Sequence, residues 1–306
     1  MNSSRLSELE RLATALTQGA ALELYLTPKP GLVDLADCGS HPDLSLAIME
    51  RSIRILADYL DEITRSLVDG EPFLYQKRIG MRTERRLLDS LGTNTHKGYV
   101  FLSGMLLIAR WRAASPDEPG IRQALSALAS IFFRAGQKGA SHGSLAREKY
   151  GAGGIVQESL RGFPSLFEQA LPAFRQANER RGCFSEASFA MLARLMQTVD
   201  DTTTLHRGGP AGLARVKRDG RQLEQMIAHG DDYIDYLKTL NRDYTQMNLT
   251  IGGIADMLGL AYGYLIAGGE ISAASLPQAS ATHLLASPAA SAPEQQWAAS
   301  LAAASG

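Results

Sequence analysis

Charged residues of two kinds stand in polar, glycine-rich segments of this sequence, between stretches that are mostly apolar. The cations are Lys29, Lys97 and Arg207, and the carboxylates are Asp34, Asp200, Asp201 and Asp256. Lysine and arginine bind phosphate oxygens, and Mg²⁺ prefers carboxylate and phosphate oxygens. Together these residues are the set that binding of a magnesium–nucleoside triphosphate complex requires.

The first two polar segments offer positive charge and free backbone amides. Residues 27–34 read TPKPGLVD, in which two prolines hold Lys29 in stiff, extended backbone. Residues 92–98 read GTNTHKG and precede an apolar stretch, so their amides are expected at a helix N-terminus, which favours anions. His96 and Lys97 add donors there. The alternatives are an ordinary turn between helices and a helix start capped by Thr or Asn.

The other three polar segments supply carboxylates. Residues 141–164 contain several glycines, which let backbone approach a ligand closely, and Glu158, a candidate acid or base. Residues 200–209 read DDTTTLHRGG and are predicted to form a loop after an apolar helix. Residues 248–256 read NLTIGGIAD and lead into another apolar stretch. The alternatives are a surface loop, an Asp-rich turn, and an acid that is placed only by a helix dipole.

Composition excludes several classes of protein. A formal net charge of −1 gives no overall attraction to nucleic acid or to an anionic membrane. The longest apolar run, residues 99–109, is too short to span a bilayer, and the N-terminal residues lack the apolar core of a signal peptide. Two cysteines, Cys38 and Cys183, are too few for a disulfide framework and suit a reducing compartment. We therefore expect a cytoplasmic protein that binds neither nucleic acid nor membrane.

Helical periodicity predicts the elements that position these segments. Helices are expected over residues 4–26, 83–90, 97–113, 185–198 and 252–268, and around apolar stripes from Met49 to Leu67, Ile121 to Phe132 and Leu213 to Ile227. No segment shows the alternation of a strand, so the predicted fold class is all-α, a compact multi-helix bundle. We expect one helical catalytic domain over residues 1–270 and an Ala/Ser/Pro-rich, flexible tail over 271–306. The apolar helix near the end is expected in the core or at the interface of a homodimer.

In their order along the chain, the five segments resemble the triphosphoribosyl-dephospho-CoA synthases that serve citrate lyase and malonate decarboxylase. The similar stretches are TPKPGLVD, TNTHKG, SHG with YG and GFP, DDTTTLHRGG and the GG-x-AD motif, and the likeness extends to residue 268. The DTTTLHRGG stretch is closest to the malonate decarboxylase branch. Four positions depart from the family pattern: Val156 replaces an arginine, LTIGG replaces SPGG, Thr203 replaces an asparagine, and Leu35 with CGSH at 38–41 replaces Arg with Asn-Gly-Ala-His.

The resemblance implies a transferase that joins ATP to 3′-dephospho-CoA and releases adenine. The 2′-hydroxyl of dephospho-CoA attacks C1′ of the ATP ribose, and the product is the precursor of a prosthetic group. A downstream prosthetic-group transferase and an acyl carrier protein are the implied partners. The C1′–N9 bond breaks through an oxocarbenium-like state, so a carboxylate base, a donor to the departing adenine and a clamp on the triphosphate are needed.

These needs give each candidate residue a hypothetical role. The catalytic candidates are Glu158 or Asp201 as base and His96 or His206 as acid or phosphate donor. The candidates for binding ATP are Lys29, Gly31, Thr93, Asn94, Thr95, Lys97, Gly98, Arg207, Gly208, Gly252 and Gly253. Those for Mg²⁺ are Asp34, Asp200 and Asp256. The remaining histidines, His41, His229 and His283, are expected to be solvated or structural.

Three rival functions remain open from the residues alone. A hydrolase that cuts an N-glycosidic bond would use the same clamp with water as the acceptor. A nucleotide-binding accessory protein would bind without turnover. A phosphotransferase would release ADP, but the chain contains no recognised kinase loop.

Overall fold

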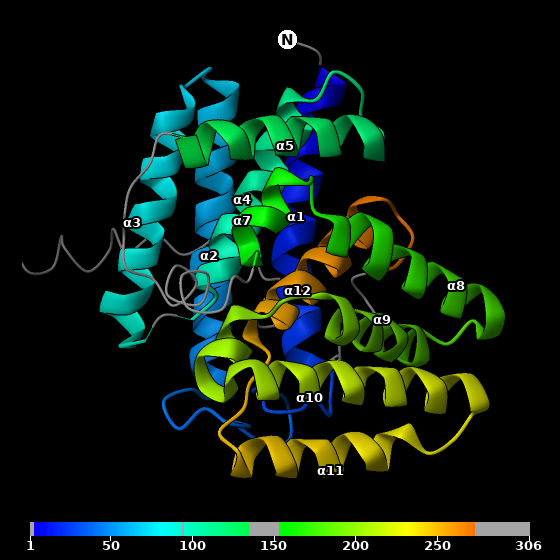
Figure 1. Ribbon diagram of the computed structural model, residues 1–306. Coiled ribbons are helices and arrows are strands. Elements are labelled where there is room, and N and C mark those ends of the chain that lie inside the picture. Colours follow the sequence, from blue (N-terminus) through cyan, green and yellow to red (C-terminus); the bar gives the residue numbers. More distant parts are fainter. Residues whose placement is uncertain (1–2, 94, 135–152, 273–306) are drawn as a thin grey trace, which may run out of the picture.

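The computed structural model describes residues 3–93, 95–134 and 153–272, and every regular element within them is a helix (Figure 1). This confirms the predicted all-α fold class. The elements are α1 (Ser3–Tyr25), α2 (Leu46–Val68), α3 (Phe73–Leu91), α4 (Lys97–Arg112), α5 (Glu118–Arg134), α7 (Gly154–Leu160), the π-helical turn η1 (Ser165–Ala170), α8 (Leu171–Arg181), α9 (Phe184–Thr198), α10 (Thr202–His229), α11 (Tyr233–Gln246) and α12 (Gly252–Ala267).

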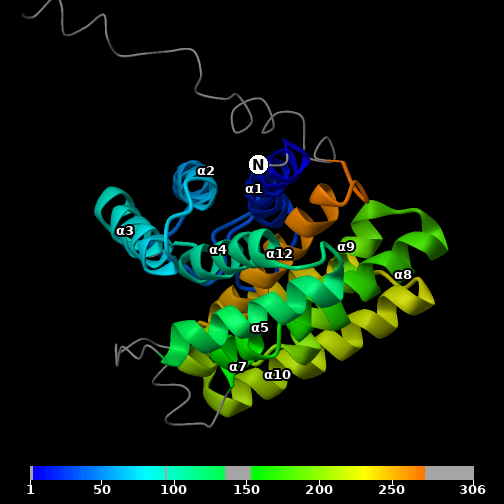
Figure 2. The ribbon, with the colours of Figure 1, turned by 90° about the horizontal axis from the view of Figure 1, so that it is seen from above.

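Helices α1 and α12 lie side by side in the middle of the molecule, although they come from opposite ends of the described chain (Figure 1). From above, α2, α3 and α4 lie to one side of this pair and α8, α9 and α10 to the other (Figure 2). Helix α5 packs on α4, and α10 packs along α9. The central pair therefore carries polar segments from both halves of the chain toward each other.

Glycines allow the backbones of α1 and α12 to touch. A Cβ atom at Gly19 would lie 2.3 Å from the carbonyl oxygen of Gly259, and one at Gly263 would lie 2.8 Å from Leu16 Cα. No larger side chain fits at such separations without a backbone shift. Helix α12 is therefore packed closely against α1. Of the two places expected for this helix, the structure shows the core.

Some helices are longer than predicted or were missed. Helix α3 begins at Phe73, whereas the sequence predicted only residues 83–90, because just four of its side chains are buried and its apolar stripe is narrow. Helices α7, α8 and α11 were not predicted. Residues 202–209 were expected in a loop, but they form the first turns of α10, which kinks at Gly209 (φ 61°, ψ −166°) before Pro210. Asp201 caps this helix, which explains its early start.

Some of the predictions concern residues outside the described part of the chain. Residues 94, 135–152 and 273–306 lie outside the described part of the chain, so Asn94, the start of the third polar segment and nearly all of the predicted tail are not tested. Within the described ranges, no helix combines the length and apolar character that a bilayer crossing needs.

Candidate active site

One cavity of about 1180 Å³ collects residues of all five polar segments. This volume exceeds the range of roughly 300–1,000 Å³ typical of sites for a single small ligand, so two nucleotide-sized molecules have room. The predicted site residues that line it are Thr93, Thr95, His96, Lys97, Gly98, Glu158, Asp200, Asp201, His206, Arg207, Gly252, Gly253 and Asp256. Lys29, Gly31, Asp34 and Gly208 are not among its lining residues.

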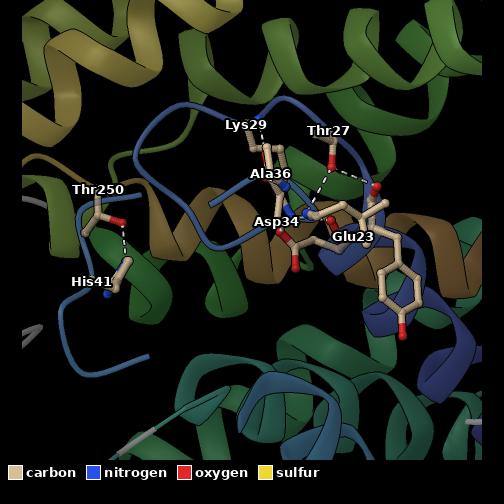
Figure 3. A network of polar contacts seen from close by, with 9 residues as sticks. Glu23, Thr27, Lys29, Asp34, Ala36, His41 and Thr250 are labelled. Atoms are coloured by element: carbon tan, nitrogen blue, oxygen red, sulfur yellow. Dashed lines mark hydrogen bonds and ion pairs between the residues drawn. The ribbon is translucent and has the colours of Figure 1, made fainter. Parts of the chain in front are cut away.

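Lys29 and Asp34 hold the first polar segment together (Figure 3). The Lys29 side chain is completely buried, and its Nζ lies 2.7 Å from Glu23 Oε1. Asp34 Oδ2 accepts the backbone N–H of Lys29 at 2.8 Å, and Oδ1 accepts that of Ala36 at 2.7 Å. Both side chains are thus engaged inside the protein. Their placement does not support the hypothetical roles at a phosphate and at Mg²⁺, which stay predictions.

Two glycines named for ATP binding also lie against protein atoms. Gly31 has a positive φ of 67°, and a Cβ there would lie 2.3 Å from the carbonyl oxygen of Leu249. A Cβ at Gly208 would lie 2.7 Å from the Leu249 side chain. These glycines make room for Leu249 in the segment before α12, and their predicted role in binding ATP stays a prediction.

Glu23 is a cavity residue that the sequence reasoning missed. It lies on α1, is 5 % exposed and lines the cavity. Burial raises its pKa, and the Lys29 ammonium offsets only part of this effect. A glutamate within the apolar stretch AALELYL was the available signal, because a buried acid needs a partner.

His96 stands where the second polar segment enters α4. It is the residue preceding the helix and has left-handed backbone (φ 47°, ψ 22°), which is uncommon for a residue other than glycine. Nδ1 lies 2.7 Å from Ser52 Oγ on α2, and Thr95 Oγ1 donates to the same oxygen at 2.6 Å. Burial, followed by the nearby charge of Lys29, lowers the pKa of His96 to about 4. At neutral pH the imidazole is therefore uncharged. No sequence signal pointed to Ser52, which lies within an apolar stripe.

Asp201 joins the starts of α10 and α12. Oδ1 accepts the amides of Thr203 and Thr204 at 2.8 and 2.9 Å, and Oδ2 accepts the amide of Ile254 at 2.9 Å. Burial raises its pKa, and these backbone donors oppose the rise. Asp201 therefore brings the fourth and fifth polar segments together at one wall of the cavity.

Asp256 is a buried carboxyl group whose environment favours a proton. Its pKa is raised well above the ordinary value, first by burial and then by the charges of Glu23 and Asp201. A Cβ at Gly98 would lie 2.0 Å from Asp256 Oδ2, so the absence of a side chain at Gly98 lets α4 and α12 meet here. The acidic side chains of α1 and of the residue that caps α10 thus both act on Asp256 of α12 at the cavity.

The remaining predicted polar residues contact other side chains at the rim. Lys97 Nζ lies 3.2 Å from Glu84 Oε2, and Lys217 Nζ lies 2.6 Å from Asp200 Oδ1. Glu158 accepts two hydrogen bonds from Ser165, at 2.7 Å from the amide and 2.9 Å from the hydroxyl, and burial raises its pKa. His206 is exposed and lines the cavity.

Arg207 ties three segments of the chain to one another. Its guanidinium donates to the carbonyl of Ser40 at 2.7 Å and to Asn248 Oδ1 at 2.9 Å. Beside it, His41 Nε2 lies 2.8 Å from Thr250 Oγ1 (Figure 3), and burial lowers the pKa of His41 to about 4. His41 lines the cavity, as does Arg161, an exposed cation that the sequence reasoning did not select.

The described side chains do not build a metal cage. No three His, Cys, Asp or Glu residues in the described ranges are grouped to hold an ion. Magnesium, however, is commonly held by one or two protein carboxylates together with substrate phosphates and water. Asp200 at the exposed rim is a donor of this kind. The residues therefore fit a magnesium ion only as part of a phosphate complex.

Comparison with known proteins identifies the family to which the chain belongs. The model of the ATP:dephospho-CoA triphosphoribosyl transferases matches residues 9–270, which is most of the chain and contains all five polar segments. The chain belongs to this family. The family resemblance, the transferase class and the function predicted from the sequence are thereby confirmed.

Relatives with curated names agree with this assignment. A 2-(5″-triphosphoribosyl)-3′-dephosphocoenzyme-A synthase of Klebsiella pneumoniae is 30 % identical over 270 residues, covering 83 % of this chain and 89 % of the relative. A probable synthase of the same name from Azotobacter vinelandii is 31 % identical over 268 residues, covering 84 % and 91 %. One from Pseudomonas putida is 28 % identical over 267 residues, covering 83 % and 94 %. No solved structure gives a significant match.

Proposed function

We propose that this family member binds ATP and 3′-dephospho-CoA together in the central cavity and transfers the 5-triphosphoribosyl group to the 2′-hydroxyl of dephospho-CoA, with release of adenine. The observation that carries the proposal is the meeting of all five polar segments in one cavity of about 1180 Å³. Cations at its rim and carboxyl groups at its inner wall separate a phosphate-binding region from a region suited to a cationic sugar.

The inner carboxyl groups stabilise the sugar as the C1′–N9 bond breaks. Glu23 and Asp201 each act electrostatically on Asp256 at the cavity. Positive charge that develops on the ribose is favoured beside them, because attraction is strong where water is excluded. Of the three, Asp201 is fully engaged with backbone amides. We therefore assign the acceptance of the 2′-hydroxyl proton to Asp256 in its ionised form, which must be present when the two substrates are bound, and its raised affinity for a proton favours that transfer.

The triphosphate is held at the rim. Lys97, Arg161 and Arg207 line the cavity and provide positive charge. The amide of Gly252 opens the sixteen-residue helix α12 beside them and adds a donor for an anion, whereas the next amide, that of Gly253, donates to Asp201. Asp200 would contact Mg²⁺ that arrives with ATP. The ion would neutralise part of the phosphate charge and so keep the triphosphate intact and in place.

The product would serve as the precursor of an acyl-carrier-protein prosthetic group, attached by a downstream transferase. Between the two systems that use this chemistry, we favour malonate decarboxylase, because the DTTTLHRGG stretch is closest to that branch. A test is to supply the product and transferase with the acyl carrier protein of each system and to compare the loading of the two carriers.

The activity is tested by incubating the protein with Mg-ATP, with and without 3′-dephospho-CoA, and separating bases and nucleotides by chromatography. Free adenine that depends on dephospho-CoA is the expected result. Adenine released equally without dephospho-CoA would identify an N-glycosidic hydrolase, and ADP without adenine would exclude the transferase. Binding of ATP with no turnover would indicate a nucleotide-binding accessory protein.

A pair of variants tests the assignment of the base. Asp256→Asn is expected to lower kcat by about 10²-fold or more, because it removes a proton acceptor. Asp58→Asn is the matched control, since Asp58 pairs with Arg86 at 2.8 Å on an exposed face and is not a cavity residue. Full activity of a folded Asp256→Asn protein would remove Asp256 from the chemistry.

A further inference from the structure

Two hydroxyl groups beneath the cavity wall form a directed chain that ends on His96. Thr95 Oγ1 donates to Ser52 Oγ at 2.6 Å, and Ser52 Oγ lies 2.7 Å from His96 Nδ1. Thr95 is 3 % exposed and the Ser52 side chain is completely buried. Water therefore does not compete for these positions.

With Thr95 as the donor to Ser52, this chain favours one of the two tautomers of His96. A hydroxyl has one hydrogen, and Ser52 already accepts the hydrogen of Thr95. The hydrogen of Ser52 is then free to point to His96 Nδ1, which accepts it. A neutral imidazole that accepts at Nδ1 carries its hydrogen at Nε2.

The second ring nitrogen of His96, Nε2, has no hydrogen-bond partner among the described residues. Nε2 of His96 is buried, and none of the described residues pairs with it. A buried polar atom without a partner is unfavourable, and such atoms are rare in folded proteins. The left-handed backbone of His96, with φ of 47°, adds a second unfavourable feature at the same residue. His96 lines the cavity, so a bound ligand is the available partner.

We propose that Thr95 and Ser52 are positioning residues that hold His96 as the neutral Nε2–H tautomer, and that this N–H donates a hydrogen bond to an acceptor atom of the bound ATP. The inference rests on the proposed function only in naming ATP as the ligand. Purine ring nitrogens and phosphate oxygens are both acceptors of the required kind. No proton is transferred, because a neutral imidazole donates a hydrogen bond without giving up its hydrogen.

The tautomer is measured on the full-length protein by nitrogen NMR of ¹⁵N-labelled histidine side chains, with His96→Gln used to assign the signals. Nδ1 is expected to resonate as an unprotonated nitrogen and Nε2 as a protonated one at neutral pH. The Nδ1–H tautomer or an imidazolium would overturn the proposal. Thr95→Val is expected to mix the two tautomers, and Thr95→Ser, which keeps the hydroxyl, to restore the single form.

A matched control separates this effect from the loss of any buried hydroxyl. Ser66 lies on the same helix as Ser52 and donates to its own helix, to the carbonyl of Ile63 at 2.7 Å. Ser52→Ala is expected to change the tautomer of His96, and Ser66→Ala to leave it unchanged. A shift of equal size in both variants would show a general structural effect and would overturn the positioning role.

The acceptor is identified with two probes that each carry one half of ATP. A shift of the Nε2 signal with tripolyphosphate alone identifies a phosphate oxygen, and a shift with adenosine alone identifies a purine nitrogen. No shift with either probe or with ATP would overturn the proposed hydrogen bond. These measurements need no turnover, so they remain distinct from a failure of the transferase assay.

Kinetics provides an independent readout. Glutamine can place an N–H near the position of Nε2, whereas asparagine is too short. We expect His96→Asn to lose about 10²-fold in kcat, the size found on removing one preorganised donor, and His96→Gln to retain most activity. Equal losses in the two folded variants would contradict a role for a donor at this position.

Discussion

Replacing Lys29 with methionine tests whether its ammonium serves the protein or a phosphate. In the structure Nζ lies 2.7 Å from Glu23 Oε1, with the two side chains 0 % and 7 % exposed. Methionine retains most of the apolar length of lysine but leaves the Glu23 carboxyl buried without a cation. Such a group folds in its protonated form, because an unpaired buried charge is far more unfavourable.

The expected cost follows from the ordinary pKa of glutamate, 4.5. Holding that carboxyl protonated at pH 7 costs at most about 3.4 kcal/mol, at about 1.36 kcal/mol per pH unit, and about 0.7 kcal/mol at pH 5. The sign follows from linkage. A carboxyl group whose pKa is raised in the folded state makes folding less favourable as the pH rises, because the unfolded chain releases its proton first.

The assay is urea unfolding of the wild type and of Lys29→Met at both pH values. A loss of at most about 3 kcal/mol at pH 7 that falls below about 1 kcal/mol at pH 5 is expected, because the wild type already bears the part of this cost that Lys29 does not offset. Adding Glu23→Gln removes the titrating group, so the difference between the two pH values should vanish. Lys217→Met is the matched control. Its partner Asp200 is 45 % exposed, so the loss should stay below about 1 kcal/mol.

One result would refute this reasoning. If Lys29→Met unfolds like the wild type at both pH values and instead raises the KM for ATP at least tenfold, the ammonium binds phosphate and the pairing with Glu23 contributes little. The role predicted for Lys29 from its two flanking prolines would then be supported.

Three further predictions concern packing, capping and pH. Gly19→Ala should lower the free energy of unfolding by about 1–3 kcal/mol, because its Cβ would lie 2.3 Å from the backbone of α12. The control Gly80→Ala, whose Cβ would have no atom nearer than 3.9 Å, should raise the free energy of unfolding by up to about 1 kcal/mol. Urea unfolding measures both, and a Gly19→Ala protein as stable as the wild type would contradict the close packing of α1 and α12. Asp201→Asn should cost about 1.5–3 kcal/mol, since an amide nitrogen replaces an acceptor of backbone N–H groups, and an unchanged thermal midpoint would argue against the bridge between α10 and α12. The pKa of His96 is lowered from 6.5 to about 4 in the folded protein. As the pH is lowered through this window the unfolded chain binds the proton first, so the free energy of unfolding of the wild type decreases. His96→Gln should remove this part of the slope, at most about 1.4 kcal/mol per pH unit, and equal slopes would show that His96 titrates normally.

Much of the fold was predictable because helical periodicity is local. The regular apolar spacing predicted α1, α2, α4, α5, α9 and α12, each close to its observed bounds. Prediction found only the second half of α3 and missed α11, because the buried faces of these helices are narrow and partly polar, with residues such as Gln76 and Asn241 on the buried side. A periodic apolar signal is weak in such helices.

The sequence predicted which polar segments form the site, but not which side chains contact one another within it. Thirteen of the candidate residues line one cavity, because polar residues at helix ends collect where the ends of packed helices meet. Glu23 and Ser52 were missed although each lies within an apolar stripe: the acid at Glu23 indicated a buried partner without identifying it, and nothing in the local pattern marked Ser52. The individual roles at ATP and Mg²⁺ remain predictions for the assays above.

The sequence by itself determined the helical class, the five polar segments and, through their order, the family. The tertiary structure alone decided how the charges are used. It paired Lys29 with Glu23, set Ser52 against His96, and placed Asp256 beside two other acids. The physical reason is that the energy of a polar group depends on its removal from water and on the partner that compensates for it. Burial and most of the partners arise only when helices from different parts of the chain pack together.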